Sequence, residues 1–430
     1  MRRRTYLFAL VGSRGDVQPA LPVALELRRR GHRVTTAVAP NLVPMARRLG
    51  LDPVPVGVDS SALLESELVR EELRARDPRR RLRALRQVST HGWDQLRTGL
   101  QEILDQGDPA DVIVTGLLGQ EVGSALAERH GTTLATLHYC PVRGNRSVSP
   151  VPGLGSGVRL ALAWRAAEHA RWMLTRAEEN RQRAAIGVTP AVVDLQRRLD
   201  ASGVVEIQAY DPLLVPDLAA EWGGPHRPFT GYLALSRGDA AMLGETELEP
   251  DLEAWLQAGD PPVYVGFGSM PVRDPDALLD DVERACSALG LRALIAGGWN
   301  DFGDTADAAA DAVEGRVRVV ASVDHAAVFP RCAAVVHHGG AGTTAAGLRA
   351  GRPTVIGWYS ADQPVWGALV QRAGLGVSRR GRSLTGAGLT SALEAALAPD
   401  VRRRAADAAG RMIPPEVAVA AAVDALELAG

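Results

Sequence analysis

Residues His337–Gly367 read HHGGAGTTAAGLRAGRPTVIGWYSADQPVWG, and this stretch predicts how the second half of the chain folds. The apolar run Ala333–Val336 is typical of a buried strand, and Thr343–Ala350 is typical of a helix. Three glycines lie on the turn between them: Gly339, Gly340 and Gly342. The pattern is therefore strand, glycine turn, helix.

A glycine turn before a helix is a common anion site. Glycine lets the backbone approach a ligand, and the free N–H groups and positive dipole end of the helix point into the gap. Phosphate is the usual occupant. The stretch lacks the GxxxxGK[ST] pattern and the chain contains no lysine, so a P-loop that depends on its lysine is excluded.

Strand and helix patterns alternate along the rest of the chain. The first half has strand patterns at Thr5–Val11, Arg33–Ala39, Asp111–Gly116 and Thr132–His138. The second half adds strand patterns at Val263–Gly268, Leu291–Ala296, Arg316–Val320, Ala333–Val336 and Thr354–Gly357. Such alternation predicts parallel sheets covered by helices on both faces. We expect an α/β fold with two doubly wound, Rossmann-like domains.

Prolines and glycines crowd the stretch Asp211–Pro228 between the two series, which we interpret as the linker. This predicts a first domain over residues 1–225, a second over residues 226–412, and a final helix within residues 413–430. Two long helical insertions, Leu63–Leu104 and Val158–Ile186, belong to neither sheet. The arginine run inside the first insertion is interpreted as a solvated helix face rather than a membrane-docking surface.

Composition favours a soluble enzyme of the reducing cytoplasm. The net charge of -2 gives no reason to expect nucleic acid as a partner. The three cysteines are odd in number and widely spaced, which fits neither a disulfide framework nor a metal cluster. No apolar segment reaches the roughly 18 residues that a membrane helix needs, so stable membrane insertion is not expected. The sequence leaves the oligomeric state open.

A second motif follows the first predicted strand, where Gly12–Pro19 reads GSRGDVQP. Together with His337–Thr344 and Asp362-Gln363-Pro364, this motif makes the chain resemble the family 1 glycosyltransferases, in the bacterial branch of sterol and antibiotic glycosyltransferases. The resemblance spans almost the whole chain. It implies the GT-B arrangement, in which two Rossmann-like domains face each other across a cleft and the C-terminal helix crosses back onto the first domain.

The resemblance also implies which residues bind the donor, a nucleotide sugar. His338 would donate a hydrogen bond to a donor phosphate, with the remaining contacts from the same loop supplied by Gly340, Gly342 and Thr343. His337 would support the loop. Other donor contacts are implied at Ser13, Arg14, Ser269, Val323, Asp362 and Gln363. For Asp362 the alternative is an N-cap, and the same alternative applies to Ser269.

Asp16 is the predicted catalytic base, because the loop aspartate is thought to fill that role in the GSRGD branch. The alternative is that Asp16 only caps a helix starting at Val17. An exposed carboxylate titrates near about pH 4, so a useful base would need a desolvated site. His138 is a second candidate catalytic residue, which could contact the acceptor or assist Asp16, with packing as its alternative.

Two departures from related patterns bear on the donor. Ser322 stands where many relatives carry an aromatic residue that stacks on the base, and Ala346 stands where the plant-type pattern has a glutamate for the ribose. Both departures weaken the expectation of uridine and allow thymidine, so the donor is expected to be a UDP- or TDP-sugar. Asp274-Pro275-Asp276 matches a DxD metal pattern, but both acids are interpreted as helix caps and first-turn residues. No cofactor and no metal are expected.

The predicted function is an inverting, metal-independent transfer of a sugar to a hydroxyl of a hydrophobic natural-product or lipid acceptor. Three alternatives stay open: a C-glycosyltransferase, a GT-B epimerase, and a catalytically silent nucleotide-sugar-binding activator. An epimerase would not need the helical insertions, and a silent protein is expected to lose the base or the phosphate histidine, whereas Asp16 and His338 are both present. The acceptor itself is not readable from the sequence.

Overall fold

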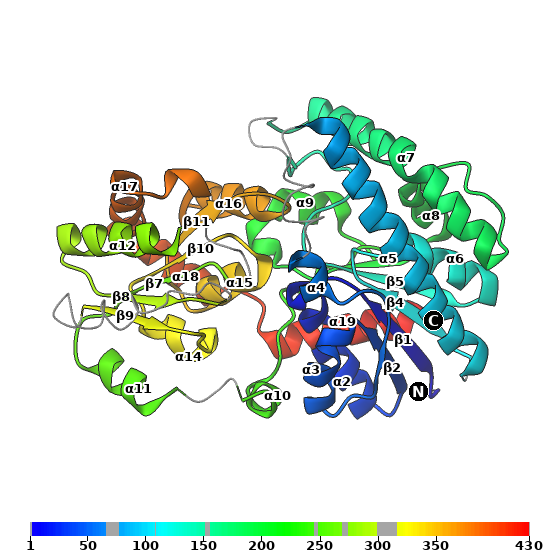
Figure 1. The fold of residues 1–430 in the computed structure, drawn as a ribbon, viewed down its shortest axis with the longest axis horizontal. Coiled ribbons are helices and arrows are strands. Elements are labelled where there is room, and N and C mark those ends of the chain that lie inside the picture. Colours follow the sequence, from blue (N-terminus) through cyan, green and yellow to red (C-terminus); the bar gives the residue numbers. More distant parts are fainter. Residues whose placement is uncertain are drawn as a thin grey trace.

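The computed structural model describes residues 2–65, 77–107, 109–150, 155–244, 248–268, 274–298 and 316–429, with side chains left out at residues 64–65 and 78–89. One predicted site residue, Ser269, lies outside the described residues. The described chain forms two sheets that lie side by side in Figure 1.

The first sheet has six parallel strands in the order β3-β2-β1-β4-β5-β6. Its strands are β1 (Thr5–Leu10), β2 (Arg33–Val38), β3 (Pro53–Pro55), β4 (Val112–Thr115), β5 (Thr133–His138) and β6 (Val205–Gln208). The central strands are buried on both faces, which is why they read as continuous apolar runs. The order reverses between β1 and β4, so a topological switch point lies there.

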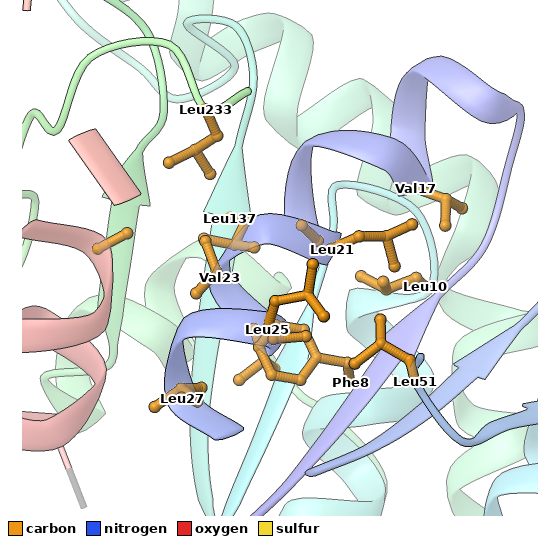
Figure 2. Close-up of a cluster of buried hydrophobic side chains, with 14 of the residues drawn as sticks. Phe8, Leu10, Val17, Leu21, Val23, Leu25, Leu27, Leu51, Leu137 and Leu233 are labelled. Carbon is orange, nitrogen blue, oxygen red and sulfur yellow. The ribbon is translucent and has the colours of Figure 1, made fainter. Parts of the chain in front are cut away.

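One face of this sheet is covered by α2 (Leu21–Arg29), α3 (Val43–Arg48) and the C-terminal helix α19 (Pro415–Ala429). Figure 2 shows the core beneath them, where Phe8 and Leu10 of β1 lie among leucines of α2. The other face is covered by α5 (Pro78–Gln106), α6 (Gln120–His130), the end of α7 (Val158–Ile186) and α8 (Leu195–Ser202). Shorter helices are α1 (Arg14–Val17), α4 (Ser60–Glu65), α9 (Pro216–Trp222) and α10 (Arg237–Met242).

The second sheet also has six parallel strands, in the order β12-β11-β10-β7-β8-β9. Its strands are β7 (Val263–Gly266), β8 (Ala293–Ala296), β9 (Val317–Val320), β10 (Ala334–His337), β11 (Thr354–Trp358) and β12 (Gly376–Arg380). The helices around it are α11 (Pro250–Gln257), α12 (Pro275–Leu289), α14 (His325–Val328), α15 (Ala341–Arg349), α16 (Gln363–Arg372), α17 (Ala387–Ala396) and α18 (Pro399–Ala409). Its order reverses between β7 and β10. The predicted pair of doubly wound domains is confirmed.

Helix α19 joins the two halves of the chain, because it follows the second sheet in sequence and packs on the first (Figure 1). Its buried residues belong to the same core as β1 and α2. The segment before α11 also belongs to the first half: Leu233 and Leu243 enter that core, and Asp239 pairs with Arg29 at 2.6 Å. These contacts are with the first sheet, although the sequence placed the second domain from residue 226.

An aromatic cluster forms the interface between the halves. Trp366 of α16 is fully buried, and its ring lies 5.8 Å from that of Tyr210 and 5.7 Å from that of Tyr232. Arg349 of α15 donates to the carbonyl of Tyr232, and the N–H of Ile413 donates to the carboxylate of Asp211 at 2.8 Å. These contacts fix the two sheets relative to each other, with their switch points on facing edges.

Candidate active site

Loops from both switch points meet between the sheets. In doubly wound sheets a ligand binds beyond the carboxyl ends of the strands at the switch point. The loop that begins at Gly12 follows β1 in the first sheet. Gly268 follows β7, and His338 follows β10, in the second. The residues that the two motifs contribute therefore sit where the topology provides a binding site.

The loop after β10 is built around close backbone approaches. Gly339 has a φ of +95°, and a side chain there would collide with Ile356. A Cβ atom added to Gly340 would lie 2.7 Å from Nε2 of His338, and one added to Gly268 would lie 3.6 Å from its Cε1. The His338 imidazole is thus held between two glycine backbones. Burial lowers its pKa, so the ring is neutral near pH 7 and can act as a hydrogen-bond donor without bringing a charge.

Helix α15 starts at this loop, with Gly340 as its N-cap residue. A Cβ at Gly342 would meet open space, and Thr343 is half-buried, so the first turn offers its backbone N–H groups outward. His337 is fully buried, and its Nδ1 accepts a hydrogen bond from the N–H of Gly339 at 3.0 Å. This hydrogen bond holds the glycine turn, which is the kind of support for the loop that the resemblance implies for His337.

Asp362 lies at the N-cap of α16 but makes no side-chain capping hydrogen bond. Its Oδ2 instead accepts from Nε1 of Trp366 at 2.9 Å. Ala361, just before it, has a φ of +58°, the one positive φ of a non-glycine residue in the described chain. Such strain collects at functional sites, where the surrounding structure enforces it. The strained turn and the indole together orient the Asp362 carboxylate.

Gln363 is buried and shapes the same turn. Its Oε1 accepts from the N–H of Tyr359 at 2.8 Å and from the N–H of Ser360 at 3.2 Å. The amide oxygen is therefore used to fold the loop that carries Asp362. Its predicted contact with a donor sugar stays a prediction.

Asp16 lies in the first turn of α1, which begins at Arg14 rather than at the predicted Val17. Its Oδ2 accepts from the backbone N–H of Ser13 at 2.7 Å and from the Ser13 hydroxyl at 2.9 Å. Gly12, with a φ of +116°, leaves room for this carboxylate, which a side chain at that position would strike. Burial raises the pKa of Asp16, although both Ser13 hydrogen bonds lower it. Asp16 therefore makes a capping contact at the start of α1, and its carboxylate is also desolvated.

Charged groups of one domain shift the pKa values of groups on the other domain. Burial raises the pKa of Asp362, and the charge of Asp16 raises it further. Burial also raises the pKa of the Cys140 thiol, with added contributions from Asp362 and Asp16. On the other side, burial lowers the pKa of His325 to about 4, and the charges of Arg14 and His338 lower it further. Asp16 and Arg14 of the first domain therefore lie near enough to Asp362 and His325 of the second domain to shift their pKa values.

His138 has a different environment from the one the sequence suggested. It is fully buried at the end of β5, where its Nε2 lies 2.8 Å from Nε2 of Gln120 and 3.7 Å from the Glu206 carboxylate. Arg143 pairs with Glu206 at 2.6 Å. Burial, aided by the charge of Arg143, lowers the pKa of His138 to about 3, so the ring is neutral. This geometry favours the packing alternative, and a catalytic role for His138 stays a prediction.

The structure also places the predicted DxD pattern and the predicted nucleobase contact Val323. Asp274 accepts from the N–H of Ala277 at 3.0 Å as the N-cap of α12, in agreement with the interpretation of the DxD pattern as a cap. Within the described residues no group of three or more acidic, histidine or cysteine side chains is placed to hold a metal. Val323 is half-buried beside the core that contains Phe329, and Asp324 caps α14 through the N–H of Ala326.

Hollows lie on both edges of the first sheet. One of about 360 Å³ is lined by Val56, Gly57 and part of α5, and Gly57 lies against Val11 at the base of the Asp16 loop. A larger one of about 970 Å³ lies at the opposite edge, where Thr133 and Val205 begin their strands. Only the first adjoins the candidate active site. Among the described helices, none is both long and apolar enough to cross a bilayer.

Comparison with known proteins agrees with this architecture. Residues 301–422 match the family model described as Erythromycin biosynthesis protein CIII-like, C-terminal domain. The chain is 40% identical over 428 residues to an uncharacterized glycosyltransferase of Mycobacterium tuberculosis, covering 98% of each chain. It is 31% identical over 427 residues to the vancomycin aglycone glucosyltransferase of Amycolatopsis orientalis, covering 96% of this chain and 95% of that one.

Solved structures share the fold. The calicheamicin glycosyltransferase CalG4 superposes with a TM-score of 0.72 at 20% identity, covering 100% of this chain and 98% of that one. The glycosyltransferase SsfS6 of Streptomyces sp. SF2575, in complex with thymidine diphosphate, gives a TM-score of 0.60 at 20% identity, covering 98% of this chain and 100% of that one. Since the sequence relatives match along nearly their whole length, the chain belongs to the family 1 glycosyltransferases of the GT-B fold, in the branch that includes the antibiotic glycosyltransferases.

Proposed function

We propose that this glycosyltransferase transfers a sugar, with inversion, from a nucleoside diphosphate to a hydroxyl of an apolar natural-product or lipid acceptor. The observation that carries the proposal is the placement of the two loops: the Asp16 loop follows β1 at the switch point of the first sheet, and the loop from His338 to Thr343 follows β10 at the switch point of the second. A base on one domain and a sugar-binding carboxylate on the other would bracket the reacting carbon.

The donor diphosphate would lie at the start of α15. There His338, Gly340, Gly342 and Thr343 offer an imidazole, backbone N–H groups and a hydroxyl to the phosphates. These groups would stabilise the charge that develops on the leaving diphosphate. Arg14 would add a positive charge from the first domain, and the lowering of the His325 pKa by this charge supports that role. Ser13 donates its backbone N–H and its hydroxyl to the Asp16 carboxylate and so holds that side chain in place.

The reaction would be a single displacement. The acceptor hydroxyl attacks the anomeric carbon from the face opposite the diphosphate, and its proton passes to the Asp16 carboxylate. The bond from the anomeric carbon to the diphosphate oxygen breaks, and that oxygen keeps the electron pair. The sugar product then has the inverted anomeric configuration. A dry interface strengthens each of these contacts, because fewer water molecules screen them.

Thymidine diphosphate is the donor nucleotide that we favour, with uridine diphosphate as the alternative. SsfS6, which shares the fold, was solved with thymidine diphosphate. The segment predicted to hold the base, at Val323, offers backbone and small side chains rather than a stacking ring. The acceptor would enter over the hollow beside Gly57, at the edge of α5.

The test is transfer to a panel of phenolic and lipid alcohols from TDP-glucose and UDP-glucose, followed by proton NMR of the anomeric signal. We expect a β-linked product from an α-linked donor, at a rate that a chelator does not change, because the α15 terminus and His338 would take the place of a metal. A product that keeps the α configuration, or a rate abolished by chelation, would contradict the proposal.

Trp366→Phe should lower kcat/KM for the nucleotide-sugar donor. It should leave the Kd of TDP, which carries no sugar, unchanged. The phenyl ring keeps the contacts with Tyr210 and Tyr232, but the hydrogen bond to Asp362 is lost. Since hydrogen bonds to charged groups contribute roughly 1.5–3 kcal/mol, we expect kcat/KM to fall about tenfold or more. The measurement pairs kcat/KM for the sugar donor with the Kd of TDP.

Trp164→Phe is the matched control, because Trp164 is also buried and its indole donates to the carbonyl of Val148 at 3.0 Å rather than to Asp362. Equal effects of the two substitutions on the sugar donor, or a parallel loss of TDP affinity in Trp366→Phe, would contradict an orienting role for Trp366.

The pH dependence of transfer should reflect the raised pKa of Asp16. The base form is the deprotonated carboxylate, so activity is present above this pKa and is lost as the pH falls through it. Because burial raises the pKa of Asp16, the acid limb of kcat/KM should lie above the value of about 4 that an exposed aspartate gives. An acid limb at or below that value would indicate a solvated carboxylate instead.

A further inference from the structure

The first half of α7 exposes an apolar stripe to solvent. Val158, Leu162 and Met173 are 65%, 57% and 46% exposed, and their spacing places them on one side of the helix together with His169. The opposite side carries Leu160 and Trp164, which are buried against the first domain. Large apolar side chains therefore face away from the protein along this part of α7.

The same stripe carries positive charge without acidic partners. Arg159, Arg165 and Arg176 are exposed, and no ion pair links any of them to an acid within the described residues. Glu168 is the one acidic residue between Val158 and Ala177, and its carboxylate accepts from the N–H of Gly144. The exposed side of α7 is thus both apolar and cationic.

The last turns of α7, after residue 177, have the opposite character, which Arg171, paired with Glu121 at 2.8 Å, already shares. Arg181 pairs with Asp94 at 2.9 Å, Arg183 pairs with Glu128 at 2.7 Å, and Arg198 of α8 pairs with Glu179. Arginines there stabilise the fold of the first domain. Arg159, Arg165 and Arg176 form no such ion pair with any described residue, although Arg176 lies over the ring of Trp172, so their charges are available to an anionic surface.

The exposed stripe lies on the same edge of the first sheet as the site. The N–H of Gly157, just before α7, donates to the carbonyl of Arg146 at 2.7 Å, and Gly144 is held by Glu168. Residues 142–150 follow the carboxyl end of β5, the edge at which the Asp16 loop also lies. Figure 1 shows α7 running beside α5, the helix that lines the hollow at Gly57. A surface that contacts α7 would therefore lie next to the acceptor entrance.

We propose that the outward stripe of α7, defined by Val158, Leu162, Met173, Arg159, Arg165 and Arg176, docks this enzyme on the surface of an anionic lipid bilayer. Apolar side chains would enter the headgroup region while the arginines bind lipid phosphates and extend their stems along the same surface. Docking is peripheral and reversible. It rests on the proposed function only in its consequence, that the acceptor hydroxyl is presented from the bilayer.

The test is sedimentation of the purified full chain with vesicles. One set is pure phosphatidylcholine, and the other contains phosphatidylglycerol in addition. Binding is expected to the anionic vesicles, weaker binding to the neutral ones, and a steep decline with salt, since exposed charges are screened within about 10 Å at 0.1 M ionic strength. Equal binding to both vesicle types, or none to either, would overturn the proposal.

Two double variants locate the surface. Arg165→Gln with Arg176→Gln should lower the affinity for anionic vesicles by about 25-fold, because each arginine near such a surface contributes about fivefold. Leu162→Gln with Met173→Gln should lower the affinity for both vesicle types. All four side chains are exposed on α7, so the fold and the Kd of TDP should not change, and thermal unfolding verifies the fold.

The matched controls remove similar groups elsewhere. Val192→Gln changes a side chain that is 83% exposed outside α7, and Arg402→Gln with Arg403→Gln removes two exposed charges from α18. A loss of vesicle binding in the controls equal to that in the α7 variants would refute the assignment to this surface. Because vesicle binding and TDP binding are measured separately, a failure of docking is distinguishable from a failure of the proposed function.

Discussion

Replacement of Asp16 by asparagine should lower the rate of sugar transfer by a factor of about 10² to 10⁴, the usual contribution of a positioned general base. The asparagine oxygen can still accept from the N–H and hydroxyl of Ser13, so the loop and α1 should keep their conformation. The Kd of TDP should stay unchanged, because the proposed diphosphate site at the start of α15 lies on the other domain. Transfer under single-turnover conditions and a TDP titration measure the two effects.

Asp274→Asn is the control for this experiment. Asp274 is also an aspartate at the start of a helix, but it only caps α12. Its substitution should cost a little stability and leave transfer intact. If Asp16→Asn retained the wild-type rate, Asp16 would be a structural cap, and another group would have to take the acceptor proton.

His338→Ala should weaken the binding of the donor diphosphate by roughly 10- to 100-fold, as expected for one lost hydrogen bond to a charged group. The ring is neutral because burial lowers its pKa, so the loss reflects a hydrogen bond and not an ion pair. The loss should therefore depend little on ionic strength. Calorimetric titration with TDP at two salt concentrations measures both features.

Thymidine provides the internal control for His338. Thymidine lacks the diphosphate and should bind more weakly than TDP. Its Kd should be the same for the wild type and for His338→Ala. His226→Ala changes an exposed histidine far from the site and should leave both affinities unaltered. A His338→Ala variant that binds TDP as well as the wild type would show that the phosphates lie elsewhere.

The central strands of both sheets were predictable because they are buried on both faces and read as uninterrupted apolar runs. Three of the four edge strands were missed: β3 is a three-residue strand with two prolines, β6 contains Glu206 and Gln208, and β12 ends in Ser378-Arg379-Arg380. Edge strands more often carry charges and prolines, as these three do, and such residues resemble those of loops. The topology supplies them, but local patterning does not.

The glycine loops of the site were predictable for a similar reason, since a turn that needs positive φ or a close approach leaves glycine in the sequence. Contacts between distant segments leave no such local mark. The hydrogen bond from Trp366 to Asp362 resembles ordinary helix packing in the sequence, and the influence of Asp16 on Asp362 joins residues from opposite domains. The burial of His138 depends on Gln120, Arg143 and Glu206, which come from three different elements.

The most direct test of the account is calorimetric titration of the purified protein with TDP, UDP and GDP in the presence of a chelator. The account predicts that one pyrimidine diphosphate, TDP in our proposal, binds at a single site with micromolar affinity and that thymidine alone binds far more weakly. This result would place a diphosphate site in the protein without requiring a known acceptor. Absence of binding by all three nucleotides would contradict the proposal that the loop from His338 to Thr343 holds a donor diphosphate.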